Sequence, residues 1–323
     1  MRIVVTGGAG YIGSVVAKQL LAAGHEVVVL DDLSRGHADA IPAGAAHADV
    51  SLLDSPALER ELAGVDAVMH FAALALVAES VERPHRYWRS NVTGTLNLLD
   101  AMRAHGVGRL VFSSTYAAYG EPRTVPITED EPTAPVNAYG ACKLAVDLMI
   151  RDECRGNGLA AASLRYFNVA GASGELGEDH EPETHLIPLV LQAAAGAREH
   201  VSVFGTDYPT RDGTAVRDYI HVEDLGDAHL RALDSLRPET HRVFNLGTGD
   251  GHTVREVIEA ARRVTGREIA VSDEPRRPGD PPELVAANDR ARAELGWTPR
   301  RGLDEMIADA WARHRARPRG YGD

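Results

Sequence analysis

The sequence predicts an α/β fold in which a doubly wound parallel sheet is joined to a smaller C-terminal α/β lobe. Three observations lead to this fold class. Short apolar runs rich in β-branched residues alternate with helical stretches over the first half of the chain, which is the pattern of βαβ units. A glycine-rich turn connects the first of these runs to the first helix. Beyond about residue 170 the chain changes to loops rich in Gly, Pro, Glu and Arg with isolated elements between them.

The first half supplies the elements of the parallel sheet in a regular order. Apolar runs of about five residues are typical of strands that are buried on both faces. Stretches with apolar residues three or four positions apart are typical of the helices that cover them. The expected elements are the strand Arg2–Thr6, the helix Tyr11–Ala23, the strand Glu26–Leu30, a weaker strand Ala46–Val50, the helix Ser55–Ala63, the strand Asp66–Phe71, the helix Asn91–His105, the strand Arg109–Ser113, the helix Asn137–Gly156 and the strand Ala160–Tyr166.

The second half is expected to form a smaller lobe, some of whose elements return to the first domain. Loops are predicted over residues 171–185, 205–213 and 274–282. Between them we expect the helix Leu186–Ala195, the strand Arg217–Val222, the helix Glu223–Leu236, the strand Arg242–Leu246 and the helix Thr253–Thr265. We therefore predict one domain over residues 1–170 and a second lobe over residues 171–323.

Composition and charge exclude several classes of protein. The chain has 34 Lys and Arg against 47 Asp and Glu, a formal net charge of -13, which disfavours nucleic acid as a partner. No stretch approaches the roughly 20 apolar residues of a membrane-spanning helix, and the N-terminus lacks a signal-peptide pattern. We therefore expect no membrane partner and a cytoplasmic location. Cys142 and Cys154 are predicted to be free thiols on one helix.

A dinucleotide-binding turn follows the first strand. Gly7, Gly10 and Gly13 form a G-x-x-G-x-x-G pattern between a strand and a helix. Such a turn lets the backbone approach a pyrophosphate and places it at the helix N-terminus, here at Tyr11 and Ile12. The pattern predicts a Rossmann-type domain.

A carboxylate at the end of the second strand favours one cofactor over another. Asp31 follows Gly13 by 18 residues. A carboxylate there can accept hydrogen bonds from both hydroxyls of an adenosine ribose and would repel a 2′-phosphate. The sequence therefore predicts NAD rather than NADP. The neighbouring Asp32 is expected to lie beside the cofactor site and to face solvent.

A tyrosine and a lysine open the long helix. Tyr139 and Lys143 are four residues apart and therefore share one helix face. A free phenol, with a pKa near ~10, is a poor base at neutral pH. A nearby ammonium, or the positive charge of an oxidised nicotinamide, favours the phenolate. We therefore expect Tyr139 to exchange a proton with a substrate hydroxyl.

Hydroxyl side chains end the strand that precedes this helix. Ligands of a doubly wound sheet bind beyond the carboxyl ends of its strands, and the residues there are Ser113, Ser114 and Thr115. We assign Thr115 to the hydroxyl beside Tyr139, with Ser114 as the second choice.

With these motifs in place, the chain resembles the UDP-glucose 4-epimerases of the extended short-chain dehydrogenase/reductase family over nearly its full length. The glycine and Tyr-Lys motifs are shared by many relatives, whereas GTDYPTRDGTAVRDYIHVEDL at 205–225 is much more specific. Further matching stretches are TGGAGYIGS at 6–14, LDDLSRGH at 30–37, HFAAL at 70–74, VAESVERP at 77–84, NVTGT at 91–95, FSST at 112–115, NAYGACKLAVD at 137–147, LRYFNVAGA at 164–172, HLIP at 185–188, FNLGTGDGHTVREV at 244–257 and RRPGDPPELVAA at 276–287.

The resemblance implies a reversible 4-epimerisation of UDP-galactose and UDP-glucose, with NAD bound throughout turnover. Tyr139 would take the proton of the sugar 4-hydroxyl while C4 gives hydride to NAD. The 4-keto sugar would then turn over and take the hydride back on its other face. Lys143 would tune Tyr139 and bind ribose, and Thr115 would assist through its hydroxyl.

The resemblance also implies the residues that bind each ligand. The cofactor site would further include Asp49, Val50, Phe71, Ala72, Ala73, Asn91, Ser113 and Tyr166, with Phe167 beside the nicotinamide. The nucleotide-sugar site would include Asn168, His185, Leu186, Val203, Phe204, Arg217, Tyr219, Arg277, Asp280 and Leu284. Arginine forks suit a diphosphate, and a carboxylate such as that of Asp280 can accept hydrogen bonds from ribose hydroxyls.

The partner implied by the resemblance is a second copy of the chain. Similar proteins commonly form homodimers through the helices that correspond to residues 91–105 and 140–156. Apolar side chains on these helices fit either a dimer interface or the core, and they are Val92, Leu96, Leu99, Leu144 and Leu148.

Three positions depart from the family pattern. Ala75 stands where many members have a lysine that reaches the cofactor, so one cofactor contact is missing or replaced. His185 stands where many have asparagine. Leu284 lies where a bulky aromatic residue restricts 2-N-acetyl sugars, and because it is intermediate in size, N-acetylated substrates stay open.

Other functions make different demands on the same residues. Thr115 is followed by Tyr116 and Ala117 rather than an acid pair, which disfavours a dehydratase. A 4-epimerase of UDP-N-acetylglucosamine, UDP-glucuronate or a deoxysugar nucleotide stays open, as does a non-catalytic NAD-binding protein. No residue is assigned to a metal, and Glu129, Asp130 and Glu131 are expected to face solvent.

Overall fold

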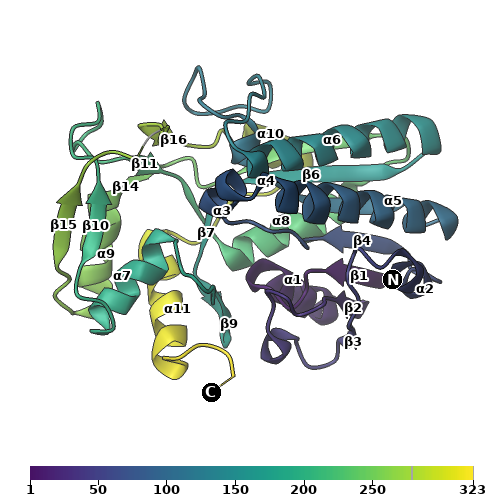
Figure 1. Ribbon diagram of the computed structural model, residues 1–323, viewed down its shortest axis with the longest axis horizontal. Coiled ribbons are helices and arrows are strands. Elements are labelled where there is room, and N and C mark those ends of the chain that lie inside the picture. The colour runs from purple at the N-terminus through teal and green to yellow at the C-terminus, as the bar shows by residue number, and fades with distance from the viewer. Residues whose placement is uncertain (278, 323) are drawn as a thin grey trace.

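A seven-stranded parallel sheet forms the centre of the computed structural model, which describes residues 1–277 and 279–322 (Figure 1). Its strand order is β13-β6-β5-β4-β1-β2-β3. The chain starts in the interior of the sheet, runs to one edge and then crosses to the other, so the predicted doubly wound fold is confirmed. The strands are β1 (Arg2–Thr6), β2 (Glu26–Leu30), β3 (Ala46–Ala48), β4 (Ala67–His70), β5 (Arg109–Thr115), β6 (Ala160–Tyr166) and β13 (His241–Leu246).

Helices cover both faces of this sheet because alternate residues of each strand point to opposite sides. Ile3 and Val5 of β1 pack with α1 (Tyr11–Ala22) and α8 (Val222–Ser235). Val4 between them packs against the opposite layer. That layer consists of α2 (Ser55–Glu61), α5 (Gly94–Ala104) and α6 (Ala138–Asn157).

A buried ion pair joins α6 to β6 below the carboxyl end of the sheet. Both Nε and Nη2 of Arg165 donate to Oδ2 of Asp147, at 3.1 and 2.7 Å. The Ser114 hydroxyl donates to the same oxygen at 3.2 Å. The Asp147 side chain is 4% exposed and that of Arg165 is 7% exposed, so either charge alone would be costly in the interior.

Arg165→Met is therefore expected to lower the free energy of unfolding by about 3–5 kcal/mol, because it leaves the Asp147 carboxylate buried without its cation. Urea denaturation followed by circular dichroism measures the change. The double variant Asp147→Asn/Arg165→Met removes both charges and should recover most of the loss. Equal destabilisation of the single and double variants would contradict this explanation.

The smaller lobe has its own hydrophobic core. It is formed by α7 (Leu186–Ala194), α9 (Val254–Thr265) and α11 (Leu303–Ala316), packed with the parallel pair β10 (Val201–Phe204) and β15 (Val271–Glu274). Short strands lie between the lobes or beside them: β7 (Asn168–Ala170) with β12 (Tyr219–His221), β8 (Ala172–Ser173) with β9 (Leu176–Gly177), and β11 (Val216–Arg217) with β14 (His252–Thr253) and β16 (Glu283–Leu284).

Several elements that follow residue 170 nevertheless pack on the first domain. β13 pairs with β6 in the main sheet, α8 packs against α1, and α10 (Asp289–Leu295) contributes to the same core. The chain therefore passes between the two lobes more than once.

The structure adds β10, β15, α10 and α11 to the sequence-based elements, and it changes three of the predicted segments. The helix expected from Asn91 is preceded by α3 (Val77–Glu82), α4 (Pro84–Tyr87) and a π-helical turn, Trp88–Thr93. The segment 171–185 contains the small β8–β9 pair rather than loop alone. The strand expected over Arg217–Val222 is interrupted at Asp218.

The interruption at Asp218 has a clear physical reason. The side chain is fully buried, and its carboxylate accepts hydrogen bonds from the backbone N–H groups of Thr248, Gly249 and Ala286 and from the Thr248 hydroxyl, at 2.8 to 3.0 Å. Asp218 therefore ties the loop after β13 to the segment after β16.

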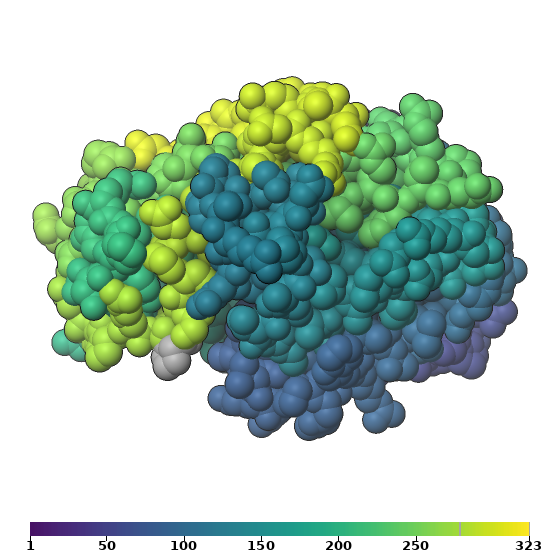
Figure 2. Space-filling view, turned by 90° about the horizontal axis from the view of Figure 1, so that it is seen from above, coloured from purple at the N-terminus to yellow at the C-terminus, as the bar shows by residue number. Residues whose placement is uncertain are grey.

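The loop between β5 and α6 packs against the C-terminal part of the chain. Figure 2 shows its teal-blue atoms beside the yellow segment around α10, where Ile127 pairs with Ala286 and Arg290 binds Asp130 at 2.9 Å. The expectation that Glu129 faces solvent is wrong: its side chain is 4% exposed and accepts a hydrogen bond from the backbone N–H of Asn245 at 2.8 Å.

Among the described residues, no helix combines the length and apolar character needed to cross a membrane.

Candidate active site

The glycine turn lies at the carboxyl end of β1 and approaches its neighbours too closely for any side chain. Gly7 has φ +70°, and a Cβ there would lie 2.5 Å from the backbone nitrogen of Ala72. A Cβ on Gly13 would lie 2.3 Å from the Gly7 carbonyl oxygen. Gly10 is the N-cap residue of α1, and no side chain caps the helix there. The free N–H groups of the first helical turn therefore point toward the glycine turn. This is the cradle that a pyrophosphate needs.

Tyr11 contributes to this cradle through its backbone alone. Its hydroxyl donates to the Gly171 carbonyl oxygen at 2.7 Å, and burial raises the pKa of the phenol well above its usual value. The side chain therefore joins α1 to the segment between β7 and β8 and is not available to a ligand.

Asp31 closes the next side of the cradle. Its carboxylate accepts hydrogen bonds from the backbone N–H groups of Ala9 at 3.0 Å and Leu33 at 2.9 Å. Burial raises the pKa of this carboxyl, although both hydrogen bonds oppose the shift. Asp32 and Asp49 are exposed beside it, and Val50 is partly buried. A partly buried acid facing a glycine turn fits the ribose end of a dinucleotide.

Asn91 positions the opposite wall rather than lining the site with its amide. Its Oδ1 accepts from the Leu74 backbone N–H at 2.8 Å, and its Nδ2 donates to the Leu74 carbonyl oxygen at 2.9 Å. These bonds fix the segment after β4, which carries Phe71, Ala72 and Ala73. Ala75, one residue further along, is exposed.

Tyr139, Lys143 and Thr115 come together at the carboxyl end of β5. Asn137 caps α6 through the Gly140 backbone N–H at 2.8 Å, which places Tyr139 in the first turn. The Lys143 Nζ lies 6.0 Å from the centre of the Tyr139 ring and donates to the Ser113 carbonyl oxygen at 2.6 Å. The sequence-based grouping of these residues therefore holds in three dimensions.

Burial opposes the charged forms of both Tyr139 and Lys143. Burial raises the pKa of Tyr139 to about 12, and its hydrogen bond with Thr115 offsets only part of that shift. Burial also lowers the pKa of Lys143 to about 8, against the opposing charge of Asp147. Lys143 alone therefore does not make Tyr139 a phenolate, and a second positive charge is needed at the site.

The neighbouring hydroxyls have separate roles. The Ser113 hydroxyl is hydrogen-bonded to the Tyr166 hydroxyl, whereas Ser114 donates to Asp147, away from Tyr139. Thr115 is therefore the hydroxyl beside Tyr139, as the sequence indicates. Tyr166 is buried and forms part of the wall next to Tyr139.

A cationic cluster lies across from Tyr139 on the smaller lobe. Arg217 pairs with Asp280, and its guanidinium also lowers the pKa of Tyr116 and Tyr219, although burial raises both overall. Arg277 lies over the Phe204 ring, 3.9 Å from its centre. Two arginines with an acid and an aromatic face provide the groups that a nucleoside diphosphate requires.

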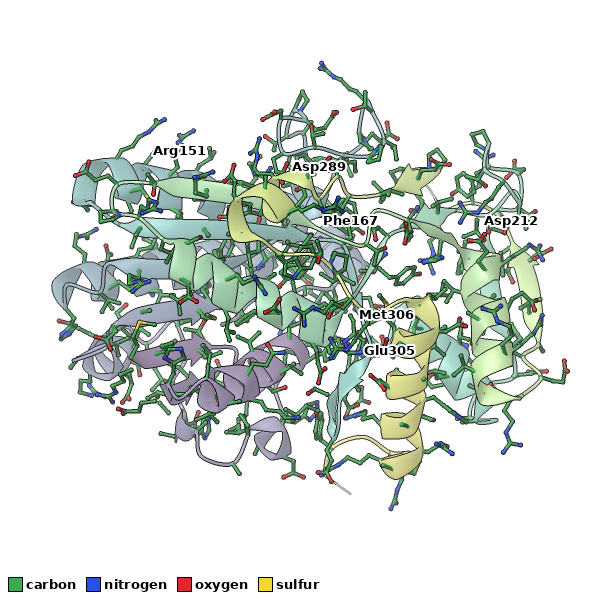
Figure 3. All side chains as sticks on the ribbon, turned by 180° about the vertical axis from the view of Figure 1, so that it is seen from behind. Arg151, Phe167, Asp212, Asp289, Glu305 and Met306 are labelled. Atoms are coloured by element: carbon green, nitrogen blue, oxygen red, sulfur yellow. The ribbon has the colours of Figure 1, made fainter. Side chains whose placement is uncertain are left out.

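The remaining predicted residues differ in what they can offer a ligand. Val203 is fully buried and can contribute only its backbone. Phe167 packs with Leu284 and stacks on Tyr116, with the two ring centres 5.0 Å apart. Figure 3 labels Phe167 where the large sheet meets the smaller lobe. Asn168 and Leu186 are partly buried.

His185 is engaged by acids rather than facing Tyr139. It is the N-cap residue of α7, and its Nδ1 lies 2.5 Å from Glu178 Oε1 and 3.4 Å from Glu183 Oε1. Its predicted contact with a substrate is therefore in competition with these two carboxylates.

Sequence reasoning missed Tyr116 as a site residue. Tyr116 raises the pKa of Tyr139, and the pKa of Tyr116 itself responds to the charges of Arg217 and Asp280. Tyr116 therefore lies between the proton-transfer group and the cationic cluster. Its place directly after Thr115, at the end of a parallel strand, was the available signal.

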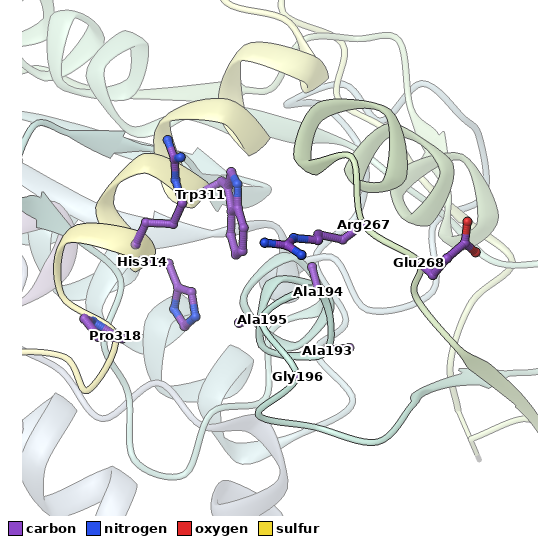
Figure 4. Close-up of a pocket in the computed structure, with 10 residues that line it drawn as sticks. Ala193, Ala194, Ala195, Gly196, Arg267, Glu268, Trp311, His314 and Pro318 are labelled. Atoms are coloured by element: carbon purple, nitrogen blue, oxygen red, sulfur yellow. The ribbon is translucent and has the colours of Figure 1, made fainter.

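A surface hollow lies away from these residues. It has a volume of about 570 Å³ and is formed by the end of α7, the segment after α9 and the end of α11, with Trp311, His314 and Arg267 around it (Figure 4). None of the predicted site residues lines it, so its size carries no functional weight.

Comparisons with known proteins place the chain in a family. A family model described as NAD dependent epimerase/dehydratase family matches residues 3–247. A UDP-glucose 4-epimerase of Corynebacterium glutamicum is 55% identical over 313 residues, which cover 97% of this chain and 95% of that protein. A Stenotrophomonas maltophila UDP-glucose-4-epimerase with bound NAD and formylated UDP-arabinopyranose has TM-score 0.95, 40% identity and 99% coverage of both chains. A Bifidobacterium longum UDP-glucose 4-epimerase with NAD+ and UDP has TM-score 0.94, 37% identity and coverage of 99% and 100%.

Proposed function

The chain belongs to the NAD dependent epimerase/dehydratase family, and from this membership we propose how its residues carry out the NAD-dependent interconversion of UDP-glucose and UDP-galactose. The observation that carries the proposal is the position of Tyr139 beside Thr115 and Lys143, between the glycine cradle and the cluster around Arg217. We assign residues 1–170 to cofactor binding and residues 171–323 to nucleotide-sugar binding.

The cofactor site is assigned to the cradle of β1 and α1. Gly7 and Gly13 bring the backbone close to the pyrophosphate, and Asp31 accepts the ribose hydroxyls. Held by these residues, NAD would supply the hydride acceptor and donor for sugar C4, and its oxidised ring would supply the second positive charge that favours ionisation of Tyr139.

Tyr139 is the proton acceptor and donor for the sugar 4-hydroxyl. Its first-turn position in α6 fixes the phenol beside Thr115, whose hydroxyl orients the reacting oxygen. Lys143 remains buried, held by the Ser113 carbonyl oxygen. When Tyr139 is ionised, the Lys143 ammonium stabilises the phenolate.

The nucleotide end of the substrate is assigned to the smaller lobe. Arg217 and Arg277 bind the diphosphate, Asp280 accepts from the uridine ribose, and Phe204 and Tyr219 supply apolar contact. A nucleotide held here places the hexose between Tyr116 and Tyr139 and anchors the substrate at its nucleotide end. That arrangement lets a 4-keto sugar turn over without releasing the nucleotide.

The test of this function is incubation of the purified chain with UDP-galactose and no added NAD, with UDP-glucose as the measured product. We expect product, because the cofactor is retained. Product formed only from UDP-N-acetylglucosamine would transfer the assignment to N-acetyl sugars. Absence of turnover with every nucleotide sugar, even with NAD supplied, would favour the non-catalytic NAD-binding alternative.

Asp31→Ala is expected to weaken NAD binding by about 10- to 100-fold, the effect of losing hydrogen bonds to a charged acceptor worth about 1.5–3 kcal/mol. NAD retained after gel filtration and a fluorescence titration measure the change. Asp39→Ala, at an exposed position nearby, is the matched control. Equal NAD retention by both variants would remove Asp31 from the cofactor site.

The proposal includes a homodimer in the cytoplasm. Two exposed apolar side chains support the dimer, Leu96 on α5 at 47% and Leu148 on α6 at 43% exposure, whereas Leu99 is buried and belongs to the core. The free thiols of Cys142 and Cys154 are compatible with a reducing compartment.

Leu148→Glu is expected to convert the dimer to monomer, because it places a charge in the proposed apolar contact. Sedimentation equilibrium measures the mass. Val271→Glu, on β15 of the smaller lobe at 39% exposure, should leave the dimer intact. A monomeric wild-type chain would refute the dimer.

A further inference from the structure

The loop between β9 and α7 gathers four metal-ligand side chains. Glu178, His180, Glu183 and His185 each offer one ligand atom, and these atoms all lie within 4.8 Å of one another. The Glu178 and Glu183 side chains are each 9% exposed, whereas those of His180 and His185 are 35% and 49% exposed. The two acids are therefore buried and the two imidazoles close the site toward solvent.

Two of the distances within the cluster are close to the edge length of a coordination tetrahedron. His180 Nδ1 lies 3.1 Å from Glu178 Oε1, and His185 Nδ1 lies 3.4 Å from Glu183 Oε1. A tetrahedral zinc with bonds of about 2.0–2.1 Å has ligand atoms about 3.3 Å apart. His185 Nδ1 and Glu178 Oε1, at 2.5 Å, would separate by less than 1 Å on binding.

One imidazole nitrogen is directed at a carboxylate inside the cluster. His180 Nδ1 lies 3.1 Å from Glu178 Oε1. When this imidazole is neutral, its Nδ1 lone pair and the Glu178 carboxylate can both bind the same cation.

The surroundings hold the ligands in place. The Glu183 carboxylate accepts from the backbone N–H groups of Thr184 and His185 at 2.7 and 2.8 Å. The Glu178 carbonyl oxygen accepts from Arg313 at 3.0 Å, and that of Glu181 accepts from Arg35 at 3.0 Å. Ligands fixed by outer contacts are typical of built metal sites.

We propose that Glu178, His180, Glu183 and His185 bind one divalent transition-metal cation, zinc by preference. Two imidazole nitrogens and two carboxylate oxygens suit zinc, whereas calcium and magnesium take oxygen ligands. Four protein ligands leave no open position, so the site is structural. His185 is then a ligand of the metal rather than of the nucleotide sugar.

The metal fixes a loop that contacts both lobes. Through Arg35 and His37 the loop contacts the segment that follows Asp31, and at its other end it leads directly into Leu186 of α7. Zinc therefore stabilises the position of α7 relative to the cofactor domain. This role does not depend on which sugar the enzyme epimerises.

The test is the zinc content of the full-length protein after chelator treatment, dialysis against ZnCl₂ and gel filtration, measured by inductively coupled plasma mass spectrometry. We expect close to one zinc per chain, with a rise in melting temperature on zinc addition. His180→Gln and Glu183→Gln should lose affinity by more than the about 10- to 100-fold typical of outer-shell changes. His105→Gln, an exposed histidine on the first domain, is the control and should bind like wild type.

His180→Cys distinguishes lost ligation from lost folding, because a thiolate can ligate zinc and should restore binding. X-ray absorption should then show sulfur among the ligands of this variant and only nitrogen and oxygen in the wild type. Less than stoichiometric zinc in the wild type, or equal zinc in His180→Gln and His105→Gln, would overturn the proposal.

Discussion

Tyr139→Phe is expected to lower kcat for UDP-galactose by about 10²- to 10⁴-fold, the usual contribution of general acid–base catalysis. The substitution removes only the hydroxyl that Thr115 contacts, so the ring and its packing remain. Bound NAD and KM should change little, because neither the glycine cradle nor the Arg217 cluster contacts that hydroxyl. Steady-state kinetics and the absorbance of retained NAD measure the two effects separately.

Tyr119→Phe is the matched control for this experiment. Tyr119 is also buried, but its hydroxyl donates to Asn245 at 2.7 Å, away from the site. Its loss should cost stability of about 1 kcal/mol and leave kcat near the wild-type value. A Tyr139→Phe enzyme with wild-type kcat would refute the assignment of the proton-transfer group.

Arg217→Met is expected to lower kcat/KM about 30- to 1,000-fold, mainly through KM. The substitution removes a bidentate cation from the diphosphate site and leaves Asp280 without its partner, a loss of about 2–4 kcal/mol. Arg217→Lys should recover only part of it, because an ammonium lacks the planar fork. Calorimetric titration with UDP measures the binding step directly.

Arg276→Met is the control for Arg217. Arg276 carries the same charge in the same region, but it binds Asp207 at 2.6 Å on the surface and is 43% exposed. Its replacement should leave UDP affinity within about threefold, as expected for an exposed ion pair worth less than about 1 kcal/mol. If both variants bound UDP equally, the diphosphate would be held elsewhere.

The sequence predicts the alternation of strands and helices and the cofactor turn well because these depend on local patterns. Alternating apolar runs and helices determine a βαβ unit, and the turn at Gly7 permits little choice of residue. The Tyr139–Lys143 spacing similarly places both side chains on one helix face. In each case the relevant residues lie within a few positions of one another.

Contacts between distant segments could not be predicted in the same way. The pairing of Asp147 with Arg165, the four hydrogen bonds of Asp218 and the position of Tyr116 each depend on how separate elements pack. The burial that raises the pKa of Tyr139 could not be predicted either, since burial is a property of the fold. The loop from Glu178 to His185 has no helical or strand period that would fix which side chains converge.

The position of β13 at the edge of the main sheet has a consequence for synthesis of the chain. β6 has only one strand neighbour until His241–Leu246 have left the ribosome. Until then the nascent chain presents an unpaired, apolar strand edge, a site where chains associate wrongly. Expression should therefore respond to chaperone supply and to pauses in translation between residues 166 and 246. A fragment that stops at residue 170 should accumulate as aggregate.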